Sequence, residues 1–321
     1  MSGFRARYDA FDRYQRSHAW LGFPLAVRQK YSDDQGGYLA ATITYYGFFS
    51  LFPLLLVFVT ALGYVLQGDP HLQRRIVSTT LGQLPLLGEG SIRALSGNPY
   101  ALVFGIAAAL WSGMGVFLAA ENALNHLWGV PFRHRADFLR SRLRALQLLL
   151  LLGGGALAST ALAGTVAFGS GLGWSAKAGA AILSTLLDFG LFWVAFHVLM
   201  AGRIDWRCLR GGAAAAAVAY EGLQVLGGYY VGHVLAGASR TYGTFGTVIG
   251  LLSWIYLGAH VTLLAAEANV VATRRLWPRS FSLIFEQPST EADRRALAQR
   301  TRVEERRQDE DVDVSWRDPA T

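Results

Sequence analysis

Residues 35–68 read QGGYLAATITYYGFFSLFPLLLVFVTALGYVLQG, and this stretch decides the fold. Its 34 residues include no Asp, Glu, Lys or Arg. About 20 predominantly apolar residues are enough for an α-helix to cross the hydrocarbon core of a bilayer. The stretch is therefore predicted to contain a transmembrane helix.

Three further windows of the chain also lack charge, and they are Ala94–Ala120, Ala145–Ala176 and Thr241–Ala266. Charged residues make up 16% of the 321 residues, whereas a soluble domain carries about 25%. The single cysteine excludes an internal disulfide. A soluble α/β enzyme, a disordered chain and a disulfide-rich secreted domain are therefore all disfavoured.

The hydropathy pattern predicts an all-α polytopic membrane protein with six transmembrane helices in a bundle. The segments must be helical, because backbone amides without partners are too costly in lipid and the runs lack the alternation of barrel strands. The predicted spans are Tyr38–Leu66, Tyr100–Ala120, Ala145–Phe168, Ala178–Ala201, Gly211–Leu235 and Phe245–Ala272.

Lysines and arginines are distributed unequally between the two sides of these spans. The N-terminal segment, the second and fourth loops and the C-terminal tail together hold 24 of them, and the other three loops hold five. Because cytoplasmic segments carry the excess of Lys and Arg, both termini are predicted to be cytoplasmic. The net charge of +7 is then a signal of membrane orientation, and we expect no nucleic-acid partner.

The chain divides into three predicted parts. Residues 1–37 form a cytoplasmic N-terminal segment, residues 38–275 the membrane domain, and residues 276–321 a charged cytoplasmic tail. Aromatic residues of the first part recur at helical spacing, which suits either an interfacial helix or a segment packed on the bundle, and they are Phe4, Tyr8, Phe11 and Tyr14. The tail has the composition of a disordered segment, because it has too few apolar residues to bury a core.

Three polar patterns occur inside or beside the apolar segments. The first is Tyr38-Leu-Ala-Ala-Thr-Ile-Thr-Tyr-Tyr-Gly-Phe-Phe-Ser50-Leu-Phe-Pro53. The second joins Tyr242-Gly-Thr-Phe-Gly246 to Leu252-Ser-Trp-Ile-Tyr256 and to Ala266-Glu267-Ala-Asn269. The third, weaker one is Ala123-Leu-Asn125 followed by Trp128-Gly-Val130. In these patterns the chain resembles the YihY/BrkB family of bacterial inner-membrane proteins, and the resemblance covers about residues 30–275.

The resemblance implies six helices in the bacterial cytoplasmic membrane, with both termini in the cytoplasm. It implies no settled activity. Some family members carry a transfer-RNA-processing ribonuclease label that is widely regarded as a misassignment, and another was linked to resistance to serum killing. Export or flipping of lipid-like molecules has been suggested for relatives.

Motifs for enzymatic chemistry are missing from the sequence. Metal-dependent RNA cleavage needs clustered His, Asp or Glu ligands, and the seven histidines are scattered. No phosphate-binding loop of the Gly-x-x-x-x-Gly-Lys-Ser/Thr type occurs. We therefore expect no enzymatic activity, no cofactor and no metal.

Ionisable groups within transmembrane helices are costly and raise a functional hypothesis. Tyr256, His260 and Glu267 share one face of the sixth span, and Glu221 and Gln224 share a face of the fifth. Pro53 predicts a kink in the first span, where Ser50 is placed to satisfy a freed carbonyl. The candidate polar pathway comprises Tyr45, Tyr46, Ser50, Pro53, Asp188, Glu221, Gln224, Tyr242, Tyr256, His260, Glu267 and Asn269.

Two functions from different classes fit these features. The first is a transporter or flippase-like protein for a lipid or another amphiphile, with the polar pathway contacting the substrate. The second is a membrane scaffold that binds partners through its cytoplasmic segments, with the same polar groups holding the bundle together. Gly-x-x-x-Gly pairs at Gly228/Gly232 and Gly246/Gly250 leave a homo-oligomer open as well.

Overall fold

The computed structural model describes residues 2–65, 99–168, 173–201, 204–229, 243–281 and 289–316. Every regular element in these ranges is helical, which confirms the all-α prediction for the described part of the chain. The only part of the predicted polar pathway that falls elsewhere is Tyr242, which lies outside the described residues.

Six long helices occupy the six predicted spans. They are α3 (Gly36–Val65), α6 (Pro99–Leu127), α7 (Phe138–Phe168), α8 (Trp174–Leu199), α9 (Arg210–Tyr229) and α11 (Thr244–Arg274). Within the described ranges, three segments are long and apolar enough to cross a membrane, namely Val103–Leu127, Ile182–Leu199 and Phe245–Arg274. The other three spans stay a prediction.

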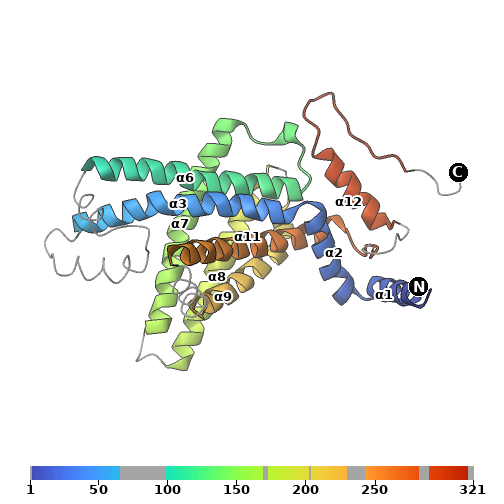
Figure 1. Cartoon of the computed structure of the whole chain (residues 1–321), viewed down its shortest axis with the longest axis horizontal. Helices are drawn as coiled ribbons and strands as arrows, with labels where there is room; N and C mark the ends of the chain where they lie inside the picture. Colours follow the sequence, from blue (N-terminus) through green and yellow to red (C-terminus); the bar gives the residue numbers. More distant parts are fainter. Residues whose placement is uncertain are drawn as a thin grey trace.

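The helices pack as one bundle (Figure 1). Helices α3 and α6 run antiparallel along each other, and α11 lies against both α3 and α9. Helices α7, α8 and α9 follow one another in contact. Large apolar side chains cover much of the outer surface, such as Trp111, Leu150, Ile182 and Phe245, which are all more than half exposed. An exposed apolar surface of this extent suits contact with lipid.

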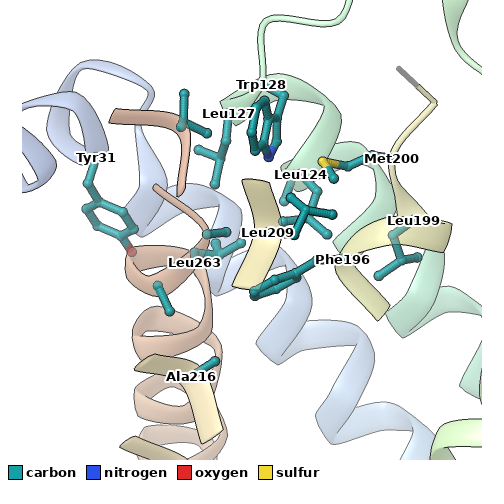
Figure 2. Close-up of a cluster of buried hydrophobic side chains, with 14 of the residues drawn as sticks. Tyr31, Leu124, Leu127, Trp128, Phe196, Leu199, Met200, Leu209, Ala216 and Leu263 are labelled. Atoms are coloured by element: carbon teal, nitrogen blue, oxygen red, sulfur yellow. The ribbon is translucent and has the colours of Figure 1, made fainter. Parts of the chain in front are cut away.

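The tightly packed core lies at one end of the bundle, near the C-terminal ends of α6 and α11. Figure 2 shows Leu127, Leu209 and Leu263 from three different elements pointing toward one another below Trp128. All four side chains are at most 2% exposed. Leu209 belongs to the short 3-10 helix η3 (Trp206–Leu209), which leads into α9.

The N-terminal segment forms two helices at this end, α1 (Ser2–Ser17) and α2 (Ala19–Asp33). Tyr8 of α1 is buried, donates a hydrogen bond to the Phe281 carbonyl and packs its ring 5.4 Å from the Phe281 ring. The Asp12 carboxylate accepts the Phe281 amide at 2.7 Å. The N-terminal segment is therefore helical and packs on the chain after α11, and its predicted interfacial position stays a prediction.

The prediction of a disordered tail is wrong for Glu291–Arg302, which forms helix α12. A capping box begins it, in which the Thr290 and Asp293 side chains each accept the other's backbone amide. Beyond α12, Arg133 holds the buried Glu305 at 2.7 Å. The prediction from composition is wrong here because a helix cap and contacts with the bundle stabilise a segment that has no core of its own. The predicted boundaries at residues 37 and 275 stay predictions.

Arg279 joins the end of α2 to α12. Its guanidinium lies 2.7 Å from the Asp33 carboxylate and 2.9 Å from that of Asp293. Asp293 also accepts hydrogen bonds from the Ser280 amide and hydroxyl at 3.0 and 2.7 Å. Burial alone would raise the pKa of the Asp293 carboxyl, but the hydrogen bonds outweigh burial and hold that pKa below its ordinary value of 3.8.

A carboxylate with a lowered pKa predicts acid-sensitive docking of α12. The contribution of Asp293 is complete above its unfolded pKa and is lost as the pH falls through the lower folded value. We expect hydrogen–deuterium exchange of α12, corrected for the intrinsic rate, to accelerate as the pH is lowered below about 3.8. Asp293→Asn should exchange fast at every pH, whereas the exposed Glu291→Gln should behave like the wild type.

Candidate functional site

A pocket of about 1220 Å³ opens between α2, α3, α11 and the segment that follows α11. One part of its lining is apolar and includes Phe23, Val27, Ala41, Leu264 and Ala268. The other part is polar and includes Arg28, Gln29, Tyr31, Ser32, Gln35, Tyr256 and His260. Arg279 and Asp293 lie at its edge, so the contacts of α12 form part of its wall. The lining of the pocket thus combines apolar side chains with polar and charged ones.

Tyr31 and His260 connect α2 to α11 inside this pocket. The Tyr31 hydroxyl lies 2.7 Å from His260 Nδ1, and Tyr256 packs its ring 5.8 Å from the imidazole. Burial raises the pKa of the Tyr31 phenol, which therefore stays protonated at neutral pH and can donate to the imidazole. Gly36 leaves room for the Tyr31 ring in this position. A Cβ at residue 36 would lie 2.2 Å from that ring, so a larger residue would displace it.

A buried cluster of charges lies beside the pocket. The Lys30 ammonium of α2 forms an ion pair with Asp34, lies 3.7 Å from Glu267 Oε2, and donates to the Leu127 carbonyl at 3.1 Å. The three side chains are 2%, 3% and 0% exposed, respectively. The cluster ties α2 to the last turns of α6 and α11.

The second pair of carboxylates lies elsewhere, between α8 and α9. Asp188 is 3% exposed, Glu221 is half-buried, and the two are close enough to interact electrostatically with each other and with Tyr220. Gln224 is half-buried on the next turn of α9. None of these residues lines the pocket described above. The carboxylates of the predicted pathway therefore occupy two separate places.

The predicted group on α3 is partly exposed and makes local contacts. Tyr45 and Tyr46 are 57% and 42% exposed, and their rings pack against each other. The half-buried Pro53 lies within α3 as predicted. Ser50, however, donates to the Gly47 carbonyl at 2.7 Å, so it does not satisfy the carbonyl that Pro53 would free. The hydroxyl simply reaches back one turn along its own helix.

Asn269 has a structural position rather than one in the pocket. Its side chain accepts the Gly212 amide at 2.6 Å and donates to the Leu209 carbonyl at 3.1 Å. It thereby satisfies the Gly212 amide, one of the first amides of α9, which have no partner within the helix.

The site residues that sequence reasoning missed all lie in or just after α2. Tyr31 completes the contact with His260, and Lys30 and Asp34 complete the cluster around Glu267. The i, i+4 spacing of Lys30 and Asp34 was a readable signal of an ion pair. In the described residues no group of three or more His, Cys, Asp or Glu side chains is placed to hold a metal ion.

Comparison with known proteins identifies the family. Residues 27–281 match the model of the family described as Virulence factor BrkB. The chain belongs to this family. That range includes the pocket lining from Val27 to Ser280 and the whole of the buried charge cluster.

Three curated relatives are distant but cover most of the chain. YfkH of Bacillus subtilis, whose name describes it as ribonuclease-like, is 27% identical over 79% of this chain and 96% of its own length. The inner membrane protein YhjD of Escherichia coli is 26% identical over 79% and 82%. A UPF0761 membrane protein of Methylibium petroleiphilum is 25% identical over 90% and 70%. No solved structure matches the chain. The long apolar helices and the membrane-protein relatives together show that this chain is a membrane protein.

Proposed function

We propose that this BrkB-family protein binds a lipid or another amphiphile in the pocket between α2, α3 and α11 and moves it across the bacterial cytoplasmic membrane. The observation that carries this proposal is a large pocket lined both by apolar side chains, such as Phe23 and Leu264, and by polar ones, such as Tyr31. Its volume of about 1220 Å³ exceeds the range of about 300–1,000 Å³ that small-molecule sites occupy. Such a site suits a polar head with a long apolar chain.

The proposal includes a topology of six spans with both termini in the cytoplasm. Lys and Arg are concentrated on the side that holds α1, α2 and α12. The pocket would then open at the cytoplasmic leaflet, where an amphiphile can enter sideways from the membrane.

The native cysteine offers a test of this topology. Cys208 is the one cysteine of the chain, is exposed, and lies in the predicted fourth, cytoplasmic loop. A membrane-impermeant maleimide should label Cys208 in inside-out vesicles and leave it unlabelled in intact cells. In a Cys208→Ser background, Ser91→Cys in the predicted first outer loop should give the opposite pattern. Equal labelling from both sides would contradict the proposed orientation.

Binding can be tested by filling the pocket. A Cβ on Gly37 would lie 3.4 Å from the Tyr256 hydroxyl, so Gly37→Phe places a ring against the polar wall. We expect this variant to lose most of the crosslinking that a photoreactive phospholipid gives with the wild-type protein in nanodiscs. The matched control is Gly154→Phe on α7, where a Cβ meets nothing within 4 Å. Equal crosslinking of both variants would remove the pocket as the binding site.

Movement across the membrane needs a separate assay. Purified protein in liposomes that carry a fluorescent phospholipid should expose the inner-leaflet probe to an added quencher faster than empty liposomes do. Gly37→Phe should abolish the gain and Gly154→Phe should retain it. Binding without any gain in rate would reduce the proposal to a lipid-binding protein.

The exposed basic face of α12 supports the scaffold as a second candidate. Arg294, Arg295, Arg300 and Arg302 are all exposed there and could receive an acidic partner. The two candidates predict opposite results in cells. Charge reversal by Arg294→Glu, Arg295→Glu and Arg300→Glu abolishes the phenotype of a scaffold, whereas Gly37→Phe abolishes that of a transporter.

A further inference from the structure

The cluster of Lys30, Asp34 and Glu267 is closed to solvent and unevenly charged. No side chain in it is more than 3% exposed. The Lys30 ammonium has its partners in Asp34 and the Leu127 carbonyl. In the described part of the chain, neither Glu267 oxygen has a hydrogen-bond partner, and Oε2 lies 3.7 Å from the ammonium. Glu267 is therefore a fully buried acid whose hydrogen-bonding capacity is unused.

One ammonium faces two carboxyl groups, so the fully ionised cluster would carry a net charge of −1. A net charge enclosed away from water costs several kcal/mol, by order of magnitude. One proton on either carboxyl group brings the cluster to neutrality. It also supplies the O–H donor that an acid at this position lacks.

The charged and titratable groups around the cluster do not supply the missing positive charge. They are Tyr31 of α2, His126 of α6, Arg135 after the 3-10 helix η2 (Phe132–His134), and Arg300 of α12. His126 is half-buried, and the loss of hydration disfavours its charged imidazole. Arg300 is exposed to solvent, which screens its charge. Arg135 donates to Asn122 at 2.5 Å and to the Val130 carbonyl at 3.3 Å, and it interacts with the buried Glu121. Tyr31 brings no positive charge in either protonation state.

We infer that Lys30, Asp34 and Glu267 form a proton-binding site in which the two carboxyl groups share one proton while α2 is docked against α11. A metal ion is the less suitable occupant, because the ammonium already stands where a cation would bind the carboxylates. Release of the proton to water leaves two carboxylates and one ammonium, and the resulting charge of −1 weakens the contact between the two helices.

This site controls the wall of the pocket. Val27 and Tyr31 line it from α2, and His260 and Leu264 line it from α11. Loss of the proton therefore loosens the helices that enclose the proposed amphiphile. The coupling to transport rests on the proposed function, whereas the proton site itself does not.

Infrared spectroscopy of the full-length protein in nanodiscs tests the site. A protonated carboxyl group gives a C=O stretching band that ionised carboxylates lack. We expect the wild type to show such absorption at neutral pH, including a component from this cluster that disappears as the pH is raised. Glu267→Gln and Asp34→Asn should each remove the same component, because either change leaves one carboxylate balanced by Lys30.

The matched control is Glu121→Gln, which alters another buried acid near the end of α6. It should leave the band lost in Glu267→Gln in place. If a variant fails to fold, carboxyl-13C labelling of glutamate or aspartate in the unmodified protein replaces it. Absorption that shifts with neither label, or that neither substitution reduces, overturns the inference. If the infrared band behaves as expected but the protein does not crosslink to the photoreactive phospholipid, the inference stands and the proposed function is wrong.

Discussion

Replacing Lys30 with methionine is expected to destabilise the protein by about 3–5 kcal/mol, the cost of removing one partner from a buried ion pair. The substitution leaves Asp34 and Glu267 without the ammonium that stands between them. It also removes one of the two side-chain donors to the Leu127 carbonyl, the other being Gln299. Thermal unfolding of the detergent-solubilised protein measures the loss.

Two comparisons make the test of Lys30 specific. Arg28→Met removes a cation from the exposed side of the same helix and should leave the melting temperature almost unchanged. The triple variant Lys30→Met, Asp34→Leu and Glu267→Met removes the whole cluster and should recover most of the lost stability, because apolar side chains can replace a buried ionic group. If Lys30→Met alone melts like the wild type, the cluster does not hold α2 in place.

Acid should reduce the deficit of Lys30→Met. Without the ammonium, the two carboxyl groups favour the protonated state in the folded protein more than in the unfolded chain. Stability that depends on protonation is present at low pH and is lost as the pH rises. A deficit that instead grows as the pH falls would contradict this account of the cluster.

The long helices could be predicted because their signal is local. A window such as Ala145–Ala176 has no charge and no strand-like alternation, so an uninterrupted helix is the one structure that satisfies its backbone in lipid. The observed α7, Phe138–Phe168, begins before that window and includes charged residues. Its first turns are therefore stabilised by packing and by solvent at the end of the bundle. Hydropathy does not predict either contribution.

The sequence does not predict contacts between residues that lie far apart in the chain. Lys30 is one of many basic residues before the first span and contributes to the orientation signal like the others. Only the fold brings it to Glu267, 237 residues further along the chain. Likewise, the face shared by Tyr256 and His260 was predicted from helical spacing, but its partner Tyr31 comes from another helix.

In the C-terminal segment, a local motif and the amino-acid composition predict different structures. Thr290 and Asp293 have the spacing of a capping box, which predicts the start of a helix. The charges around them suggested disorder instead. Helix α12 forms because Ala292 and Ala296 are buried on one face and Gln299 reaches the Leu127 carbonyl at 3.1 Å.

Asn269→Ala is expected to cost about 1–3 kcal/mol, because it leaves a buried backbone amide without a partner. This group is the Gly212 amide in the first turn of α9. The helices cannot close over the vacancy, since Gly212 already lies so near α11 that a Cβ would be 2.2 Å from the Ala265 carbonyl oxygen.

The loss at Asn269 should appear as a lower melting temperature together with faster hydrogen–deuterium exchange at the start of α9. Asn122→Ala is the control, because Asn122 is exposed and its side chain accepts a hydrogen bond from Arg135 alone among the described residues. It should change stability by less than about 1 kcal/mol, as surface substitutions usually do. The sequence predicts that Asn269 belongs to a polar pathway, whereas the structure gives it a hydrogen bond to the backbone of α9. This experiment distinguishes the two roles. A pathway residue would lower transport at unchanged stability, whereas a residue that satisfies the backbone of α9 lowers stability first and activity only as a consequence.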